Sequence, residues 1–396
     1  MRVTANKLIV PILAGSVLCL AAAGSAVDGN PAGDAAETHT VVIRRRSGTT
    51  TRPRHLEFRS AQEPVQGLDF GRRANNQLLL TRDGQLRCVQ LKQEDDVREL
   101  IKPFEPVSHR ELETAIRKEL GPKFKTLRTP HYVIGHNTTD AFAQEAADLV
   151  EDLHRAFTAY FGARGMGLER PKFPMVVLIF GDEPEFRRYM LATPGTPELK
   201  QIAGYYSVET NRVAFFNAGN DTAKYGNTQW HNMTTVIHEA THQIAFNSGC
   251  HRRSADTPLW FVEGLAMYFE APEIHGKKMV WGEIGRLNTP RLNRFAAYRK
   301  KGRTADSLKS LVTSDLRFHA DATAADAYAE SWALVYFLAN NRAPQFYKYI
   351  RTMIAKPALD QDSPEERLEE FQAAFGRDLR LIDQSFTRYI DELKKN

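Results

Sequence analysis

The segment Met175–Phe180 limits the possible folds of this chain most strongly, because it is a nearly unbroken apolar run. Such a run is typical of a strand in the interior of a sheet. His131–Ile134 predicts a further strand, and residues 139–161 predict a long amphipathic helix between the two strands. From Trp230 onward the apolar pattern is mostly helical. Strands followed by helices indicate an α+β domain, which we place at residues 126–396.

A smaller unit precedes this domain. Gln77–Leu91 predicts a β-hairpin around the turn Asp83–Gly84. Ser108–Glu111 has the Ser-x-x-Glu pattern of a capping box, which predicts the start of a helix that ends near Gly121. Together these elements predict a small α+β unit at residues 61–125.

Two segments are expected to be linkers. Pro122–Pro130 connects the two units, and residues 27–60 have little periodic apolar pattern, so we expect them to be poorly ordered. The second segment contains Arg44–Arg46, which supplies part of the formal net charge of +5. No basic stripe interleaved with aromatic residues follows it. We therefore interpret it as a solvated tail and expect no nucleic-acid partner.

The first residues predict export. Arg2 and Lys7 precede an apolar stretch at residues 8–23, and Gly24–Ala26 provides small residues for cleavage. This is the pattern of a secretory signal peptide, so we expect residues 1–26 to be removed. The mature protein would be periplasmic, cell-surface or extracellular, without stable membrane insertion. The alternative is a membrane anchor, for which the apolar stretch is short.

Two cysteines, Cys88 and Cys250, would remain after cleavage. They can form a disulfide in an oxidising compartment, although two buried free thiols are an equally good interpretation. Neither has Cys-x-x-Cys spacing, so a zinc site made of cysteines is not expected.

The strongest functional signal is the His-Glu-x-x-His pattern at His238, Glu239 and His242. The apolar residues around it recur at helical spacing, and Gly249 provides a C-terminal stop. Residues four apart lie one above the other on a helix, so both imidazoles can bind the same metal ion. Glu239 can then reach a water molecule at that ion. The alternative is a helix that carries two surface histidines and a glutamate.

A third ligand is expected from Glu263, because zinc at a catalytic site needs three protein ligands and an open position. Glu263 lies inside an apolar helical stretch that begins with Thr257 as the N-cap and Pro258 in the first turn, and ends at Pro272. A buried unpaired carboxylate is costly, and coordination of a cation removes that cost. The alternative is a carboxylate in a salt bridge at the helix edge.

The pattern His-Glu-x-x-His, followed about 20 residues later by Glu-Gly-x-Ala, resembles the gluzincin metallopeptidases, which include thermolysin and aminopeptidase N. Trp260–Tyr268 is most similar to the peptidase-MA-like branch, which contains many bacterial proteins of unknown function. Tyr328–Val335 is similar to a later helix of the same branch. The resemblance covers residues 128–390. It implies a gluzincin-like domain with a mixed-sheet subdomain and a helical subdomain.

By this resemblance the protein is an exported zinc peptidase that acts on a peptide or protein, and its Zn²⁺ ligands are His238, His242 and Glu263. Glu239 would be the general base, which takes a proton from water and passes it to the leaving amine. The oxyanion of the intermediate needs a further donor. Tyr328 is one candidate and His319 another, while Tyr328 is equally interpretable as a core tyrosine.

The chain departs from the gluzincin pattern in two respects. The relatives named above carry an acidic residue four positions after the ligand glutamate, and this chain has Met267 there. Glu270 can take over the orientation of a ligand histidine, or it can be a surface residue of the helix. The Gly-x-Met-Glu-Asn motif of the aminopeptidases is absent, so aminopeptidase activity is not expected.

Two other functions compete with a peptidase. One is a catalytically inactive gluzincin-like binding module at the cell surface. The other is a structural zinc domain, which normally needs four protein ligands. For a peptidase, the hairpin Tyr205–Phe216 is the expected substrate site, because a peptide can add itself to an exposed strand edge there. Plain sheet packing is the alternative for this hairpin, and the sequence does not indicate an oligomeric state.

Overall fold

The computed structural model describes most of the chain from Arg54 onward. The described residues are 54–58, 64–73, 76–90, 97–193, 202–219, 228–253, 255–271, 273–275, 278–280, 284–356, 359 and 361–393. The predicted signal peptide lies outside these ranges. Within them, no helix is both long enough and apolar enough to cross a bilayer.

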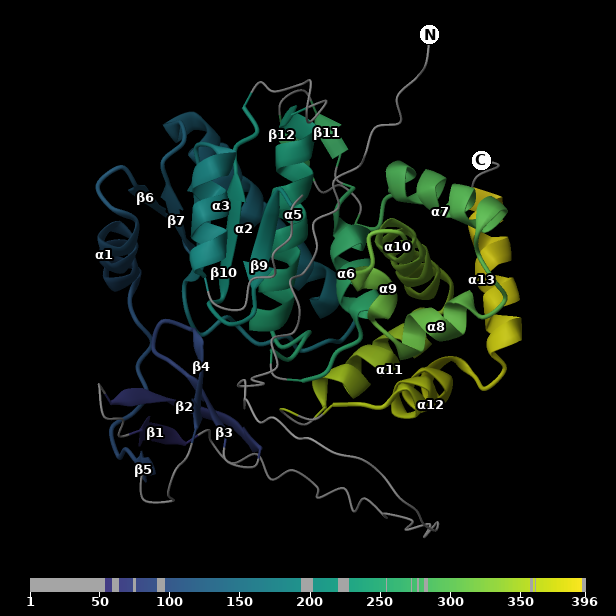
Figure 1. Cartoon of the computed structure of the whole chain (residues 1–396), viewed down its shortest axis with the longest axis horizontal. Helices are drawn as coiled ribbons and strands as arrows, with labels where there is room; N and C mark the ends of the chain where they lie inside the picture. Colours follow the sequence, from purple (N-terminus) through teal and green to yellow (C-terminus); the bar gives the residue numbers. More distant parts are fainter. Residues whose placement is uncertain are drawn as a thin grey trace, which may run out of the picture.

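The N-terminal part of the described chain is a five-stranded antiparallel sheet with the order β4-β3-β2-β1-β5 (Figure 1). Its strands are β1 (His55–Phe58), β2 (Val65–Arg73), β3 (Asn76–Leu80), β4 (Leu86–Gln90) and β5 (Val97–Glu99). The predicted hairpin is confirmed, since Leu80 pairs with Leu86 across a turn in which Gly84 has φ of 80°. The predicted boundary is wrong, because β1 lies inside the segment expected to be poorly ordered.

The capping box predicted at Ser108 is present, and α1 (His109–Leu120) ends at Gly121 as expected. This helix does not cover the N-terminal sheet. Its buried residues Leu112 and Ile116 pack on the second sheet of the protein. The N-terminal unit predicted as α+β is therefore a β-sheet alone, and α1 belongs to the larger domain.

The second sheet has five strands in the order β6-β7-β8-β10-β9. They are β6 (Lys125–Arg128), β7 (Tyr132–His136), β8 (Met175–Phe180), β9 (Gly204–Ser207) and β10 (Arg212–Phe216). The sheet is mixed: β7, β8 and β10 are parallel, and both outer strands are antiparallel to their neighbours. The segment expected to be a plain linker forms β6 instead, which sequence reasoning missed because only Leu127 in this strand is apolar.

Helices cover both faces of this sheet, which explains the apolar run of β8. Met175, Val177 and Ile179 face the core with α2 (Asp140–Gly162) and α5 (Thr228–Asn247). The alternate residues of β8 face α1 and α3 (Glu183–Ala192). The interior position predicted for this strand is therefore confirmed.

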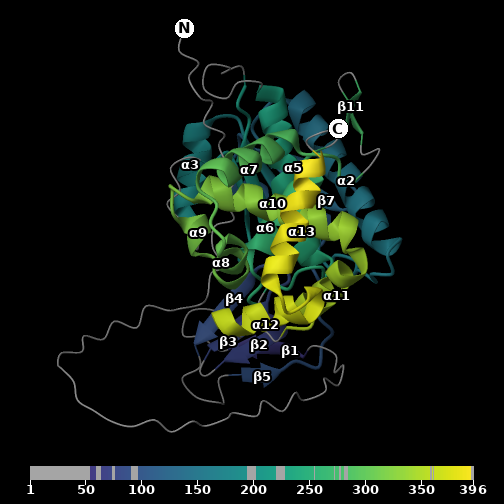
Figure 2. The same ribbon diagram turned by 90° about the vertical axis from the view of Figure 1, so that its right-hand side faces the viewer.

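The rest of the chain is mainly helical and lies beside α5 (Figures 1 and 2). It consists of α6 (Leu259–Phe269), β11 (Glu273–His275), β12 (Lys278–Val280), α7 (Thr289–Lys301), α8 (Ser307–Thr313), α9 (Leu316–His319), α10 (Ala324–Asn341), α11 (Ala343–Ile354), α12 (Pro364–Phe375) and α13 (Leu379–Leu393). The α+β class is thus confirmed, and one large apolar core joins the second sheet to these helices.

Helix α6 is packed very closely against α10. A Cβ atom at Gly264 would lie 2.6 Å from the carbonyl oxygen of Ser331 on α10, so only glycine permits this contact. The N-cap of α6 is Pro258, without a side-chain hydrogen bond. The prediction of Thr257 as the N-cap is therefore wrong by one residue.

Candidate metal centre

Helix α5 places His238, Glu239 and His242 in the interior of the protein, and all three are essentially inaccessible to solvent. Two contacts fix this helix on the second sheet. Gln243 donates to the carbonyl oxygens of Val176 on β8 and Asn211 in the β9–β10 turn, at 3.0 and 2.8 Å. The predicted helix at the His-Glu-x-x-His pattern is confirmed, while its histidines are buried rather than on the surface.

Glu263 comes from the middle of α6 and meets both histidines. Its Oε2 atom lies 3.1 Å from His238 Nε2 and 3.7 Å from His242 Nε2, and the two nitrogens are 3.0 Å apart. Ligand atoms at about 2.0–2.1 Å from a tetrahedral zinc ion would be about 3.3 Å apart. The three side chains are therefore spaced as ligands of a single ion. No other group of three or more potential ligand side chains occurs in the described parts of the chain.

The three predicted ligands also show the electrostatics of a cation site. Burial raises the pKa of the Glu263 carboxyl, but both histidines lower it further, and it ends at about 2. Burial lowers the pKa of His238, but hydrogen bonds to Glu263 and Glu270 raise it to about 10. The pKa of His242 is lowered, mainly by burial. Without a metal ion, a proton on His238 thus supplies the positive charge that this pair of carboxylates favours.

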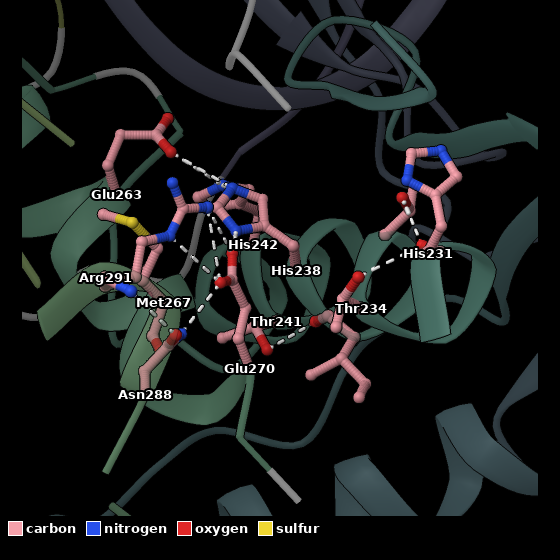
Figure 3. A network of polar contacts seen from close by, with 12 residues as sticks. His231, Thr234, His238, Thr241, His242, Glu263, Met267, Glu270, Asn288 and Arg291 are labelled. Atoms are coloured by element: carbon pink, nitrogen blue, oxygen red, sulfur yellow. Dashed lines mark hydrogen bonds and ion pairs between the residues drawn. The ribbon is translucent and has the colours of Figure 1, made fainter. Parts of the chain in front are cut away.

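Glu270 holds His238 from its other side (Figure 3). Glu270 Oε1 lies 2.5 Å from His238 Nδ1, so Nδ1 carries the hydrogen and Nε2 faces Glu263. Glu270 accepts further hydrogen bonds from Asn288 at 3.1 Å and Arg291 at 3.2 Å. Burial raises the pKa of Glu270, but Arg291 and His238 outweigh it and bring the value to about 2.

The structure decides between the two interpretations of Glu270. It is the C-cap residue of α6 and is buried rather than on the helix surface. Its carboxylate therefore orients a histidine of the cluster, and it lies three residues after Met267, the position at which the gluzincin pattern has its acid. Met267 is fully buried at that position. Its carbonyl oxygen accepts a hydrogen bond from Asn288 at 3.4 Å.

Glu239 lies next to the cluster without a partner of its own. Neither of its carboxylate oxygens has a hydrogen-bond partner among the described residues, and the same holds for Oε1 of Glu263. Burial raises the pKa of Glu239 to about 8, although His238 and the backbone of Tyr206 act in the opposite direction. Buried polar atoms are almost always satisfied, so the three unsatisfied oxygens, two of Glu239 and one of Glu263, fit a cation and a water molecule bound at this cluster.

Of the two candidate oxyanion donors, only Tyr328 is in the interior. It lies on α10, is fully buried, and its hydroxyl has no hydrogen-bond partner in the described structure. Its pKa is raised far above the usual value, first by burial and then by the charges of Glu263 and Glu239. His319, at the end of α9, is exposed. The structure therefore brings Tyr328 to the cluster and leaves His319 outside it.

Three further residues of this region were not found by sequence reasoning. Asn288 and Arg291 carry the contacts to Glu270, but they are the N-cap and a first-turn residue of α7, and no spacing rule connects them to α6. His251 is buried beside Phe261 at 4.9 Å between ring centroids. The disulfide considered between Cys88 and Cys250 is not formed. Both cysteines are free thiols, of which Cys88 is exposed and Cys250 is buried.

A family model matches part of this chain. It is described as a protein of unknown function, DUF1570, and it matches residues 232–360. This range begins in α5 and ends after α11, so it contains the cluster, Glu270 and Tyr328, but not the two five-stranded sheets. No curated protein matches the chain.

The donor set is two imidazoles and one carboxylate, which is the set of ligands that suits zinc at a catalytic site. The unpaired oxygens of Glu239 and Glu263 are also compatible with a cation at this position. The residues present therefore fit a zinc ion, which would be held by His238 Nε2, His242 Nε2 and Glu263.

Proposed function

We propose that this protein is an exported zinc-dependent peptidase of the gluzincin type. The observation that carries the proposal is the buried cluster of His238, His242 and Glu263 with the unpaired carboxylate of Glu239 beside it. A zinc ion bound by these side chains would supply a Lewis acid that lowers the pKa of water and polarises a peptide carbonyl. Each of the protein groups then has a separate task.

Glu239 is the base in this proposal. No described side chain bonds to either of its oxygens, and a zinc ion at the cluster would favour its charged form, which can accept a proton from water. Its raised pKa suits the second half of the task, in which the protonated carboxyl donates to the leaving amine. The proton is therefore taken from water and transferred to nitrogen as the C–N bond breaks.

Tyr328 is the donor for the oxyanion. Because its hydroxyl is buried, unpaired and held neutral by its raised pKa, it carries a hydrogen that can be donated to developing negative charge. Glu270 and Arg291 are positioning residues. They keep Nδ1 of His238 protonated, so that Nε2 faces the cluster.

The substrate would be a peptide or protein that binds along β9. This strand pairs with β10 alone among the described strands, and it lies next to α5. A Cβ atom at Gly204 would lie 2.8 Å from the side chain of Thr235 on α5, so the strand β9 and the helix α5 are in direct contact. A substrate strand added at this edge would pass the cluster.

A cleavage assay with a broad peptide library tests this function. The mature protein is expected to cleave peptides, to lose the activity with a chelator and to regain it with zinc. N-terminal sequencing of the protein from its native host tests export, with an expected start after residue 26. A chain that holds zinc but cleaves no peptide in the library would favour the alternative, an inactive gluzincin-like binding module at the cell surface.

A further inference from the structure

A pocket lies where the N-terminal sheet meets the C-terminal end of α5. It has a volume of about 340 Å³, which is within the range of small-ligand sites. The last turn of α5 and the following loop form one wall, and β2 and β3 contribute to the other. Its apolar lining residues are Phe70, Leu80, Phe173, Phe246 and Ile354.

The two parts of the protein are firmly joined around this pocket. Arg253 Nη1 donates to the carbonyl oxygen of Gly84 at 2.7 Å, and the amide of Leu86 donates to Glu209 at 2.7 Å. Phe173 packs with Leu68 and Leu80 of the N-terminal sheet. The pocket is therefore a fixed feature of the interface between the sheet and the larger domain.

His251 lines the pocket and has unused hydrogen-bonding capacity. Its side chain is 1% exposed, and neither ring nitrogen has a partner among the described residues. Burial lowers its pKa to about 3, so the ring is neutral and offers one donor and one acceptor. A buried imidazole without any partner is costly unless a water or a ligand supplies one.

Arg252 gives the pocket a positive charge that no acid of the described chain balances. Its Nη1 donates to the carbonyl oxygen of Lys356 at 2.8 Å, and no carboxylate pairs with its guanidinium among the described residues. Burial lowers its pKa, with no acid acting in the opposite direction. The exposed side chains of Lys172 and Glu169, which also line the pocket, have opposite charges and leave this balance unchanged.

We propose that this pocket binds a small monocarboxylate with an apolar tail. The carboxylate would pair with Arg252, the tail would lie among the phenylalanine and leucine side chains, and His251 would contribute a hydrogen bond. No residue of the His238, His242 and Glu263 cluster lines this pocket, although the charges of His242 and Glu263 are near enough to act on His251. The proposed binding does not depend on the proposed peptidase activity.

Calorimetric titration of the mature full-length protein with 3-phenylpropionate tests the site, and the neutral 3-phenylpropanamide is the matched probe. The acid is expected to bind with saturation at about 10 µM to 1 mM, in line with the affinity of ligands of this size. The amide is expected to bind about tenfold more weakly or not at all, because it cannot form the charged pair. The titration is repeated after chelation, since a carboxylate can also bind at a metal ion. Binding of 3-phenylpropionate is expected to persist in the chelated protein.

Variants locate the binding. Arg252→Gln is expected to weaken binding of the acid about tenfold or more, while Arg252→Lys retains most of it. Arg377→Gln is the matched control. Arg377 lies in another hollow, of about 490 Å³, between α8, α12 and α13. In ¹³C-labelled protein, the His251 ring signal, assigned with His251→Asn, is expected to shift with the acid.

Equal binding of acid and amide would overturn the proposal, as would unchanged binding in a folded Arg252→Gln variant. Loss of binding after chelation would assign the probe to the metal centre instead. If Arg252→Gln does not fold, the comparison of acid and amide and the His251 signal decide the question in the wild-type protein.

Discussion

Two buried glutamates in the helical region, Glu330 and Glu263, have opposite kinds of surroundings. Glu330 on α10 is fully buried, and each of its oxygens is satisfied within the protein. Arg303 donates to Oε1 at 2.8 Å. Ser307 and Arg317 both lie 2.8 Å from Oε2. At the candidate metal centre, by contrast, both oxygens of Glu239 and one oxygen of Glu263 have no partner in the described structure.

The difference lies in what neutralises the acids. Around Glu330 the chain provides two arginines, so this cluster needs nothing from outside and serves the packing of α8, α9 and α10. Around Glu263 the chain provides two imidazoles that face one another and a second glutamate nearby. Buried charges are normally paired or bound to metal. The incomplete cluster is therefore the one we expect to bind a cation and to carry the chemistry.

The largest effect is expected for Glu239→Gln. Glutamine has nearly the same size but cannot accept the proton from water. Peptide cleavage should fall by about 10²- to 10⁴-fold, while zinc content stays at the wild-type level, because Glu239 is not a ligand. Initial rates and metal analysis on the same sample measure both. Full activity with zinc still bound would remove Glu239 from the mechanism.

The second prediction concerns stability in the absence of metal. Glu330→Gln should lower the free energy of unfolding by about 2–4 kcal/mol, because it breaks a satisfied buried ion pair. Glu239→Gln replaces a carboxyl that has no partner, so it should cost far less or even stabilise the protein. Denaturant unfolding of both chelated variants gives the comparison. Equal losses would mean that the two clusters do not differ as described.

The third prediction concerns the support of His238. Glu270→Gln should weaken zinc binding about 10- to 100-fold, as is typical when the partner of a ligand histidine is altered. Competition with a chromogenic chelator measures the affinity. The double variant with Arg291→Met removes the unbalanced arginine as well. If it restores wild-type affinity, then Glu270 acts through charge balance rather than through the orientation of His238.

The smallest effect is a pH dependence of zinc affinity. In the metal-free protein the pKa of His238 is about 10, so Nε2 is protonated at neutral pH and must lose that proton before it can bind metal. Zinc affinity should therefore rise with pH up to about 10, and binding should release protons. Calorimetry at pH 7 in two buffers with different ionisation enthalpies counts them. The Glu239→Gln variant is titrated in parallel, because the carboxyl of Glu239 is also protonated at pH 7 and can release a proton. No release from this variant would show that His238 is already neutral.

Local patterns predicted the parts of this structure that depend on neighbouring residues. The apolar run of Met175–Phe180 predicted its interior strand, and the capping residue Ser108 predicted the start of α1. The four-residue spacing of His238 and His242 placed both on one face of a helix, and an apolar helix predicted that Glu263 needs a partner. In each case the information lies within a few residues of the element concerned.

The features that the sequence did not reveal depend on distant contacts. Strand β6 has little apolar character of its own and is defined by its pairing with β7. The sheet that α1 covers, the role of Arg291 and the burial of His251 all follow from packing between elements far apart in the chain. Glu270 lies between these two cases, because its residue type and position allowed a contact with His238 that only the arrangement of α5 and α6 could establish.

Zinc stoichiometry tests the central claim most directly. The wild-type protein, purified and dialysed with zinc, should retain a single zinc ion per chain. The double variant with His238→Ala and His242→Ala should retain none, and His319→Ala, which changes an exposed histidine, should behave as wild type. Elemental analysis of all three, with circular dichroism to verify folding, gives the answer. If the folded double variant still holds stoichiometric zinc, the metal lies elsewhere and the assignment of this cluster is wrong.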